Sequence, residues 1–164
     1  MLARMKRRSW PVLVGLIVLC VGTGAVAGFS TSRSVTDWYP SLIKPAWNPP
    51  SWLFGPVWTV LYITMAVAGW LVWQPAPRPR AVRAALTLFF VQLALNGAWS
   101  FIFFGARALG PALAEICLML FVIALTARAF FRESRLAGAL MLPYLAWVVF
   151  ATFLNFTIWR LNRG

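Results

Sequence analysis

Long uncharged stretches dominate the chain, and charged residues separate them. Each stretch supplies the roughly 20 consecutive apolar residues that an α-helix needs to cross the hydrocarbon core of a bilayer. A fifth apolar run is interrupted by a single acidic residue, Glu115. The intervals bounded by charges are 8–33, 44–78, 83–107 and 135–160, and the fifth run covers 108–127.

This pattern predicts an all-α fold, an integral membrane bundle of five transmembrane helices. The apolar runs are rich in Leu, Ala, Phe and Trp and lack the alternation of polar and apolar positions that marks a membrane β-barrel. We expect one domain over residues 10–164, preceded by a basic extension over residues 1–9. The expected spans are 10–29, 51–73, 84–104, 108–127 and 137–159.

Composition supports the membrane assignment. Of the 164 residues, 62% are hydrophobic and only 11% are charged. A soluble domain of this length cannot bury so large a share of apolar side chains, so much of the surface must face lipid.

The formal net charge of +12 reflects membrane topology rather than nucleic-acid binding. Ten of the 15 Lys and Arg residues fall before the first span, in the second loop or in the fourth loop, which five crossings place on one side. Because basic residues concentrate on the cytoplasmic side, we expect the N-terminus in the cytoplasm and the C-terminus outside. No nucleic-acid partner is expected.

The first apolar run also has features of a secretory signal. It follows a basic start and ends in small residues, including the Ala25-Val26-Ala27 pattern typical of a cleavage site. The run continues to Phe29, which is long enough to span a bilayer, so we expect a retained helix.

The sequence lacks the residues that several kinds of catalytic and metal site require. The chain has no histidine, which excludes the commonest haem ligand, ordinary zinc sites and His-based catalytic triads. Cys20 and Cys117 lie far apart inside predicted spans and show no metal spacing. Only Asp37, Glu115 and Glu133 are acidic, so a conventional catalytic or metal site is not expected and no cofactor is required.

Aromatic and amide side chains instead recur at helical spacing in three of the predicted spans. A bundle interior lined by such groups suits a flat, largely apolar ligand with a few polar edges. Amides facing lipid are costly, so Gln92, Asn96 and Asn155 should point inward. The same pattern is also typical of ordinary helix packing and interfacial aromatic belts. The aligned sets are Trp58 and Tyr62; Gln92, Asn96, Trp99 and Ser100; and Tyr144, Trp147, Ala151 and Asn155.

Four segments resemble the TspO family, the tryptophan-rich sensory proteins and mitochondrial translocator proteins (peripheral benzodiazepine receptors). The similarity covers about residues 22–162. The segments are D-W-Y-P-S-L-I-K-P-A-W-N-P-P-S-W from Asp37, P-V-W-T-V-L-Y from Pro56, L-N-G-A-W-S from Leu95 and P-Y-L-A-W-V-V-F-A-T-F-L-N-F from Pro143.

The resemblance implies a five-helix bundle, often a homodimer, that binds porphyrin, haem and synthetic benzodiazepine-site ligands. Haem would bind here without histidine ligation. Animal members end the fifth helix with a sterol motif that needs a tyrosine where this chain has Phe156, so sterol binding is not expected. By position, the implied ligand-binding residues are Trp38, Tyr39, Trp58, Tyr62, Asn96, Trp99, Trp147, Ala151, Leu154 and Asn155.

The proline-rich segment before the second span predicts how the first loop is positioned. We expect Asn48 as the N-cap of the second helix and Pro49 as its first residue. Together with Pro45 and Pro50, they would stiffen a lid that brings Trp38 and Tyr39 over the outer end of the bundle.

Three functions fit this sequence, and the first is preferred. The first is a receptor or sensor that binds tetrapyrroles and regulates their level or signalling. The second is a porphyrin transporter, although Glu115 is the only candidate coupling group and no inverted repeat is visible. The third is an enzyme that degrades porphyrins in light through pocket tryptophans.

Overall fold

A computed structural model describes residues 2–74 and 79–163, with side chains from Trp10 onward. The described part is a bundle of five long helices without any strand, which confirms the predicted fold class. All five helices are long and apolar enough to cross a membrane. They are α1 (Leu2–Asp37), α2 (Ser51–Trp73), α3 (Pro79–Ser100), α4 (Leu109–Glu133) and α5 (Arg135–Leu161).

Helix α2 has the predicted bounds, but other helices are longer than predicted. Helix α1 continues through Arg33 to Asp37, eight residues beyond the predicted end of the first span. Helix α4 continues through Arg128 and Arg132, so Ser134 alone separates it from α5. The thickness of the hydrocarbon core sets the length of the apolar run between charged residues. The helix itself can continue past those charged residues into the polar interface of the membrane.

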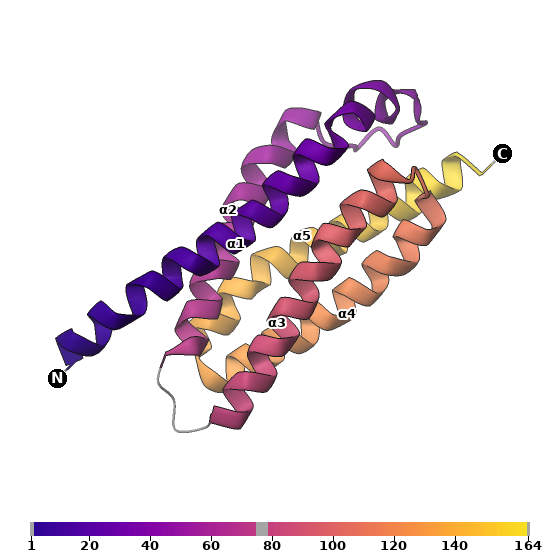
Figure 1. Cartoon of the computed structure of the whole chain (residues 1–164). Coiled ribbons are helices and arrows are strands. Elements are labelled where there is room, and N and C mark those ends of the chain that lie inside the picture. Colours follow the sequence, from indigo (N-terminus) through magenta and orange to yellow (C-terminus); the bar gives the residue numbers. More distant parts are fainter. Residues whose placement is uncertain (1, 75–78, 164) are drawn as a thin grey trace.

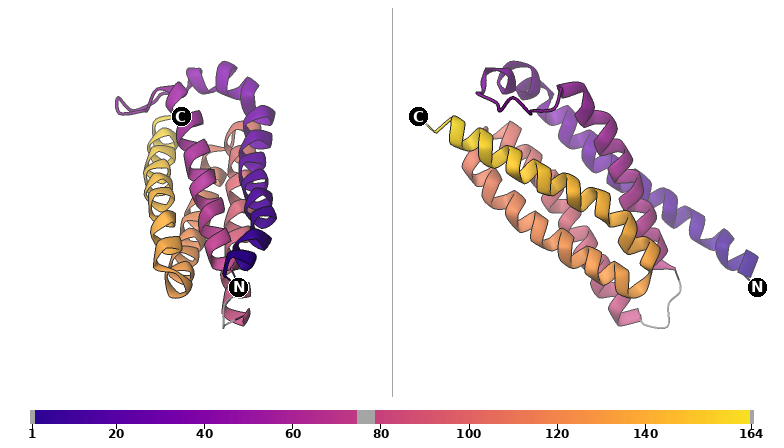
Figure 2. Two further views of the ribbon diagram at one scale, coloured as in Figure 1. Left: turned by 90° about the vertical axis from the view of Figure 1, so that its left-hand side faces the viewer. Right: turned by 180° about the vertical axis from the view of Figure 1, so that it is seen from behind.

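The helices run roughly along one axis (Figure 1). Helix α1 lies beside α2, whereas α4 packs between α3 and α5, and α2 also contacts α5. The N-terminal part of α1 extends beyond the end of the bundle, and the two chain termini lie at opposite ends (Figures 1 and 2).

Two short elements shape the end of the bundle nearest the C-terminus. A 3₁₀ turn, η1 (Tyr39–Ser41), follows α1, and a π-helical turn, η2 (Phe101–Gly105), continues α3. Arg107, directly after η2, has a left-handed backbone with φ of 54°. Single π-helical turns are frequently found at functional sites.

The predicted N-cap of α2, Asn48 with Pro49 as the first helical residue, is wrong. Pro50 occupies the N-cap position and the helix begins at Ser51, so Asn48 does not cap it. The Asn48 side chain instead accepts a hydrogen bond from the Tyr39 hydroxyl at 2.8 Å and donates one to the Pro49 carbonyl at 2.9 Å. Because Pro50 lacks an N–H, it leaves no unpaired backbone donor at the N-cap.

Candidate ligand-binding site

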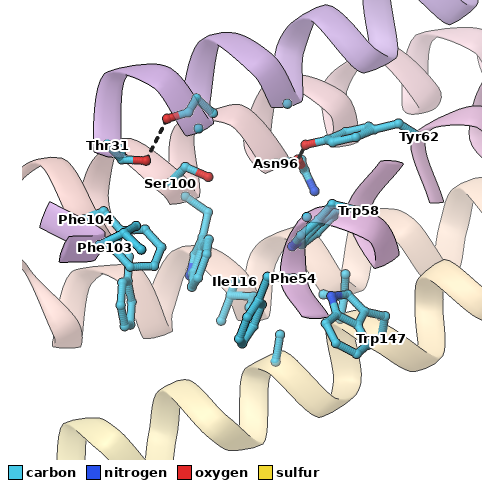
Figure 3. A pocket seen from close by; sticks show the side chains of 18 of the residues that line it. Thr31, Phe54, Trp58, Tyr62, Asn96, Ser100, Phe103, Phe104, Ile116 and Trp147 are labelled. Atoms are coloured by element: carbon cyan, nitrogen blue, oxygen red, sulfur yellow. Dashed lines mark hydrogen bonds between the residues drawn. The ribbon is translucent and has the colours of Figure 1, made fainter. Parts of the chain in front are cut away.

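A cavity of about 380 Å³ lies inside the bundle, towards the end that carries η1 and η2. All five helices contribute to its wall, and none of the described residues that line it is charged. Its volume falls within the range of small-molecule binding sites. Figure 3 shows aromatic side chains around much of this space.

The aromatic wall comes from residues distant in sequence. Trp58 of α2 lies 5.5 Å from Tyr62 and 6.2 Å from Tyr144 of α5, measured between ring centroids. The Trp147 ring meets Phe54 edge-on at 6.0 Å. Such rings present broad apolar faces to a flat ligand.

A buried hydrogen-bond chain links four helices at the deep end of the cavity. The Tyr62 hydroxyl donates to Oδ1 of Asn96, and Nδ2 of Asn96 donates to the Tyr144 hydroxyl at 3.1 Å. The chain ends on the Met119 sulfur of α4, 3.9 Å from the Tyr144 hydroxyl. Because each of these polar groups is paired, the network holds α2, α3, α4 and α5 in register.

A second amide joins the opposite part of the cavity wall. Oδ1 of Asn155 accepts a hydrogen bond from the Trp99 indole at 3.2 Å, and its Nδ2 donates to the Leu109 carbonyl at 3.1 Å. Trp99 also stacks on Phe103 at 4.9 Å. Asn96, Asn155 and Gln92 are all buried, so the prediction that these amides point into the bundle is confirmed.

The segment between α1 and α2, residues 38–50, is the predicted lid, and it reaches the cavity through Tyr39. Its Tyr39 side chain is buried and lines the cavity. Burial raises the pKa of the Tyr39 hydroxyl above its usual value, and the hydrogen bond with Asn48 opposes this shift by a smaller amount. Tyr39 is therefore a neutral phenol at physiological pH.

Polar side chains fasten the lid. The Lys44 ammonium donates to the carbonyls of Tyr39 and Leu42 at 2.8 and 2.7 Å. Asn162, just beyond α5, accepts from the Ile43 amide at 3.0 Å and donates to the Ile43 carbonyl at 2.9 Å. Hydrogen bonds thus join parts of the lid to one another and join the lid to the end of α5.

Nine of the ten site residues predicted from the sequence line this cavity. The exception is Trp38, which packs edge-on against Phe103 at 5.9 Å beneath the Arg107 guanidinium, also at 5.9 Å. Trp38 therefore supports the cavity wall from outside. The nine are Tyr39, Trp58, Tyr62, Asn96, Trp99, Trp147, Ala151, Leu154 and Asn155.

Sequence reasoning missed other wall residues, some of which carried a usable signal. Phe54 precedes Trp58 by four positions, and Phe103 follows Trp99 by four, so both extend faces already identified. Thr31 and Val35 gave no such signal because they lie beyond the predicted end of the first span.

Glu115 has an unusual position for an acidic side chain. Both its carboxyl oxygens are buried and have no hydrogen-bond partner within the described chain. The Arg107 guanidinium, a nearby cation in the sequence, lies instead over the Trp38 ring. No group of three or more potential metal ligands occurs among the described residues.

The fold and cavity define a helical membrane protein with a preformed, aromatic-lined internal site. Residues 16–160 match the model of the TspO/MBR family, and the chain belongs to that family. This agrees with the resemblance found in the sequence motifs.

Relatives occur in bacteria and animals. The chain is 43% identical to the tryptophan-rich protein TspO of Chlorobaculum tepidum, over 89% of this chain and 95% of that protein. It is 46% identical to the translocator protein of Homo sapiens, over 77% of this chain and 76% of that protein. The tryptophan-rich sensory protein of Cereibacter sphaeroides is 38% identical, over 94% of this chain and 93% of that protein.

Proposed function

We propose that this membrane protein is a receptor that binds tetrapyrroles, porphyrin or haem, in the aromatic cavity and regulates their level or signalling. The observation that carries the proposal is the cavity wall itself. It combines Trp58, Trp99 and Trp147, and no charged side chain lines it among the residues that the structure describes. A large flat ring would gain binding free energy from aromatic contact and from removal of its faces from water.

The absence of charged groups in the wall determines how such a ligand would lie. An acidic tetrapyrrole would place its ring inside and keep its carboxylates at the rim, because burying an unpaired carboxylate is costly. Haem would bind by stacking, since the chain supplies no histidine for its iron.

The proposal can be tested by titrating the purified protein with metal-free protoporphyrin while following tryptophan fluorescence. The tryptophans of the cavity wall should be quenched saturably. Ala151→Phe fills the cavity and should abolish the saturable component. Val149→Phe, on the exposed side of the same helix, is the matched control and should bind as the parent does. Equal quenching in all three proteins would overturn the proposal.

Two other functions give different results in the same preparation. Transport predicts accumulation of porphyrin inside sealed vesicles that contain the protein. Photodegradation predicts light-dependent loss of the porphyrin spectrum that requires Trp58 or Trp147. Binding without accumulation or loss of porphyrin supports the receptor function.

We further propose a homodimer with the N-terminus in the cytoplasm, based on the family resemblance and the distribution of basic residues.

A further inference from the structure

Cationic side chains at the lid end of the bundle have partners within the protein. The Lys44 ammonium donates hydrogen bonds to three lid carbonyls at 2.8, 3.1 and 2.7 Å. Three guanidinium groups each lie over an aromatic ring, whose face attracts a cation. They belong to Arg107, Arg160 and Arg163, which lie over Trp38, Phe156 and Trp159. The protein itself therefore supplies partners for these positive charges.

Exposed arginines at the opposite end have no such partners. Five of them make no hydrogen bond, ion pair or ring contact within the described chain. Of the three acidic residues of the chain, only Glu133 lies at this end, and it pairs with none of the five. Figure 1 shows the start of α3, the end of α4 and the start of α5 together there. The five are Arg80, Arg83, Arg128, Arg132 and Arg135.

Three of these arginines form one patch around the connection between α4 and α5. Arg128 and Arg132 are four residues apart on α4, which makes them neighbours on one face of the helix. Arg135 begins α5 directly after the single connecting residue, Ser134, whose amide donates to the Phe130 carbonyl at 2.8 Å. Like charges at such spacing repel one another and destabilise a helix slightly. The arginine patch is therefore suited to an anion from outside the protein.

Large apolar side chains are exposed beside the arginine patch. Phe131 is 41% exposed and Leu136 is 60% exposed, and each directly adjoins an arginine of the patch in sequence. Trp73, at the same end of the bundle, is also exposed, and tryptophan is typical of the membrane interface. Apolar groups here favour contact with acyl chains, while the long arginine side chains can reach the polar headgroups. The mixture is typical of a surface at the boundary between the two.

We propose that the arginine patch, Arg128, Arg132 and Arg135, is a docking surface for the headgroup of an anionic phospholipid. A guanidinium group can donate two parallel hydrogen bonds to phosphate oxygens, which an ammonium group cannot do with the same geometry. Arg80 and Arg83 add positive potential at the same end, and basic residues near a membrane surface attract anionic lipids. The surface is remote from the cavity, so the inference does not depend on the tetrapyrrole proposal.

The test compares phosphatidylglycerol with phosphatidylcholine of the same acyl chains, added in equal amounts to the purified protein in neutral detergent. Mass spectrometry of the intact protein–lipid complexes counts the lipid that is retained. The parent protein should retain phosphatidylglycerol with about fivefold to tenfold preference. Higher ionic strength should reduce this preference, because exposed charges are screened by salt.

Two double variants remove the same number of charges from opposite ends of the bundle. Arg128→Gln with Arg132→Gln should lose most of the preference, because glutamine keeps helix propensity but not the charge. Arg160→Gln with Arg163→Gln is the matched control and should keep the preference, because those guanidinium groups lie over rings of the protein.

Equal retention of the two lipids by the parent protein would overturn the inference. Equal losses in the two double variants would also overturn it, since they would show a response to net charge alone. A third arm adds inorganic phosphate, equimolar with phosphatidylglycerol, to the complex. Phosphate should leave the bound lipid in place, and its displacement of the lipid would assign the patch to a soluble anion instead.

Discussion

The Tyr62 hydroxyl of α2 donates a hydrogen bond to Oδ1 of Asn96 of α3, and both side chains are buried at the deep end of the cavity. The bond places the Tyr62 ring across the bundle towards α1, where it lies directly against Gly24. One tyrosine thus sets the spacing of three helices. The absence of a side chain at Gly24 is a requirement of that arrangement.

Replacing Gly24 with alanine should therefore destabilise the bundle. A Cβ atom at this position would overlap the Tyr62 ring, so the ring must move and strain its bond to Asn96. Overpacking of this kind costs about 1–3 kcal/mol, which thermal unfolding in detergent would detect.

Gly22→Ala is the matched control for Gly24→Ala. A Cβ at Gly22 has no neighbour within 4 Å, and alanine favours helix more than glycine does. Its unfolding midpoint should equal or exceed that of the parent. Equal unfolding midpoints for the two variants would show that the Tyr62 ring can move aside without loss of stability.

Asn162 should control the opening of the lid. Asn162→Ala removes both hydrogen bonds to Ile43, each of which contributes about 0.5–1.5 kcal/mol. Hydrogen–deuterium exchange of peptides covering residues 38–50 should become faster, and porphyrin should dissociate faster.

Thr157→Ala controls for a general loosening of α5, because the Thr157 hydroxyl bonds only to Phe153 of its own helix. Exchange in the lid should not change in this variant. Parent-like exchange in Asn162→Ala would mean that Lys44 and Asn48 hold the lid without help from α5.

The proposed orientation is open to direct labelling. In a background without Cys20 and Cys117, a cysteine at position 80 should be protected from an impermeant thiol reagent in intact cells. A cysteine at position 34 should react, because α1 ends and α3 begins at opposite ends of the bundle (Figure 1). The reverse pattern would place the N-terminus outside.

The sequence predicted helices more reliably than it predicted their ends. The bounds of α2 were predicted, although its N-cap was not, because Pro50 and the Gln74-Pro75 pair flank its apolar run. The end of α1 was missed because Arg33 was read as a boundary. An arginine does not stop a helix, since its long side chain can reach water while the backbone stays helical.

The wall of the cavity was predictable where one helical face repeats aromatic and amide residues, as at Asn96 and Trp99. The sequence could not show whether each polar side chain already has a hydrogen-bond partner within the protein. Asn96 and Asn155 suggested sites for the polar edge of a ligand, but the structure uses both to join helices. Which donors remain free depends on contacts between helices far apart in sequence.

We propose that a tetrapyrrole binds by stacking in this cavity without a bond to its metal. The most direct test is a parallel titration of the purified protein with metal-free protoporphyrin and with haem. Aromatic contacts contribute about 0.5–1.5 kcal/mol each beyond area burial, so we predict micromolar affinity for both, about −8 kcal/mol. The absorption spectrum of bound haem should show no axial protein ligand. Haem that binds a hundredfold more tightly than the metal-free ring, with a spectrum of axial ligation, would contradict the account.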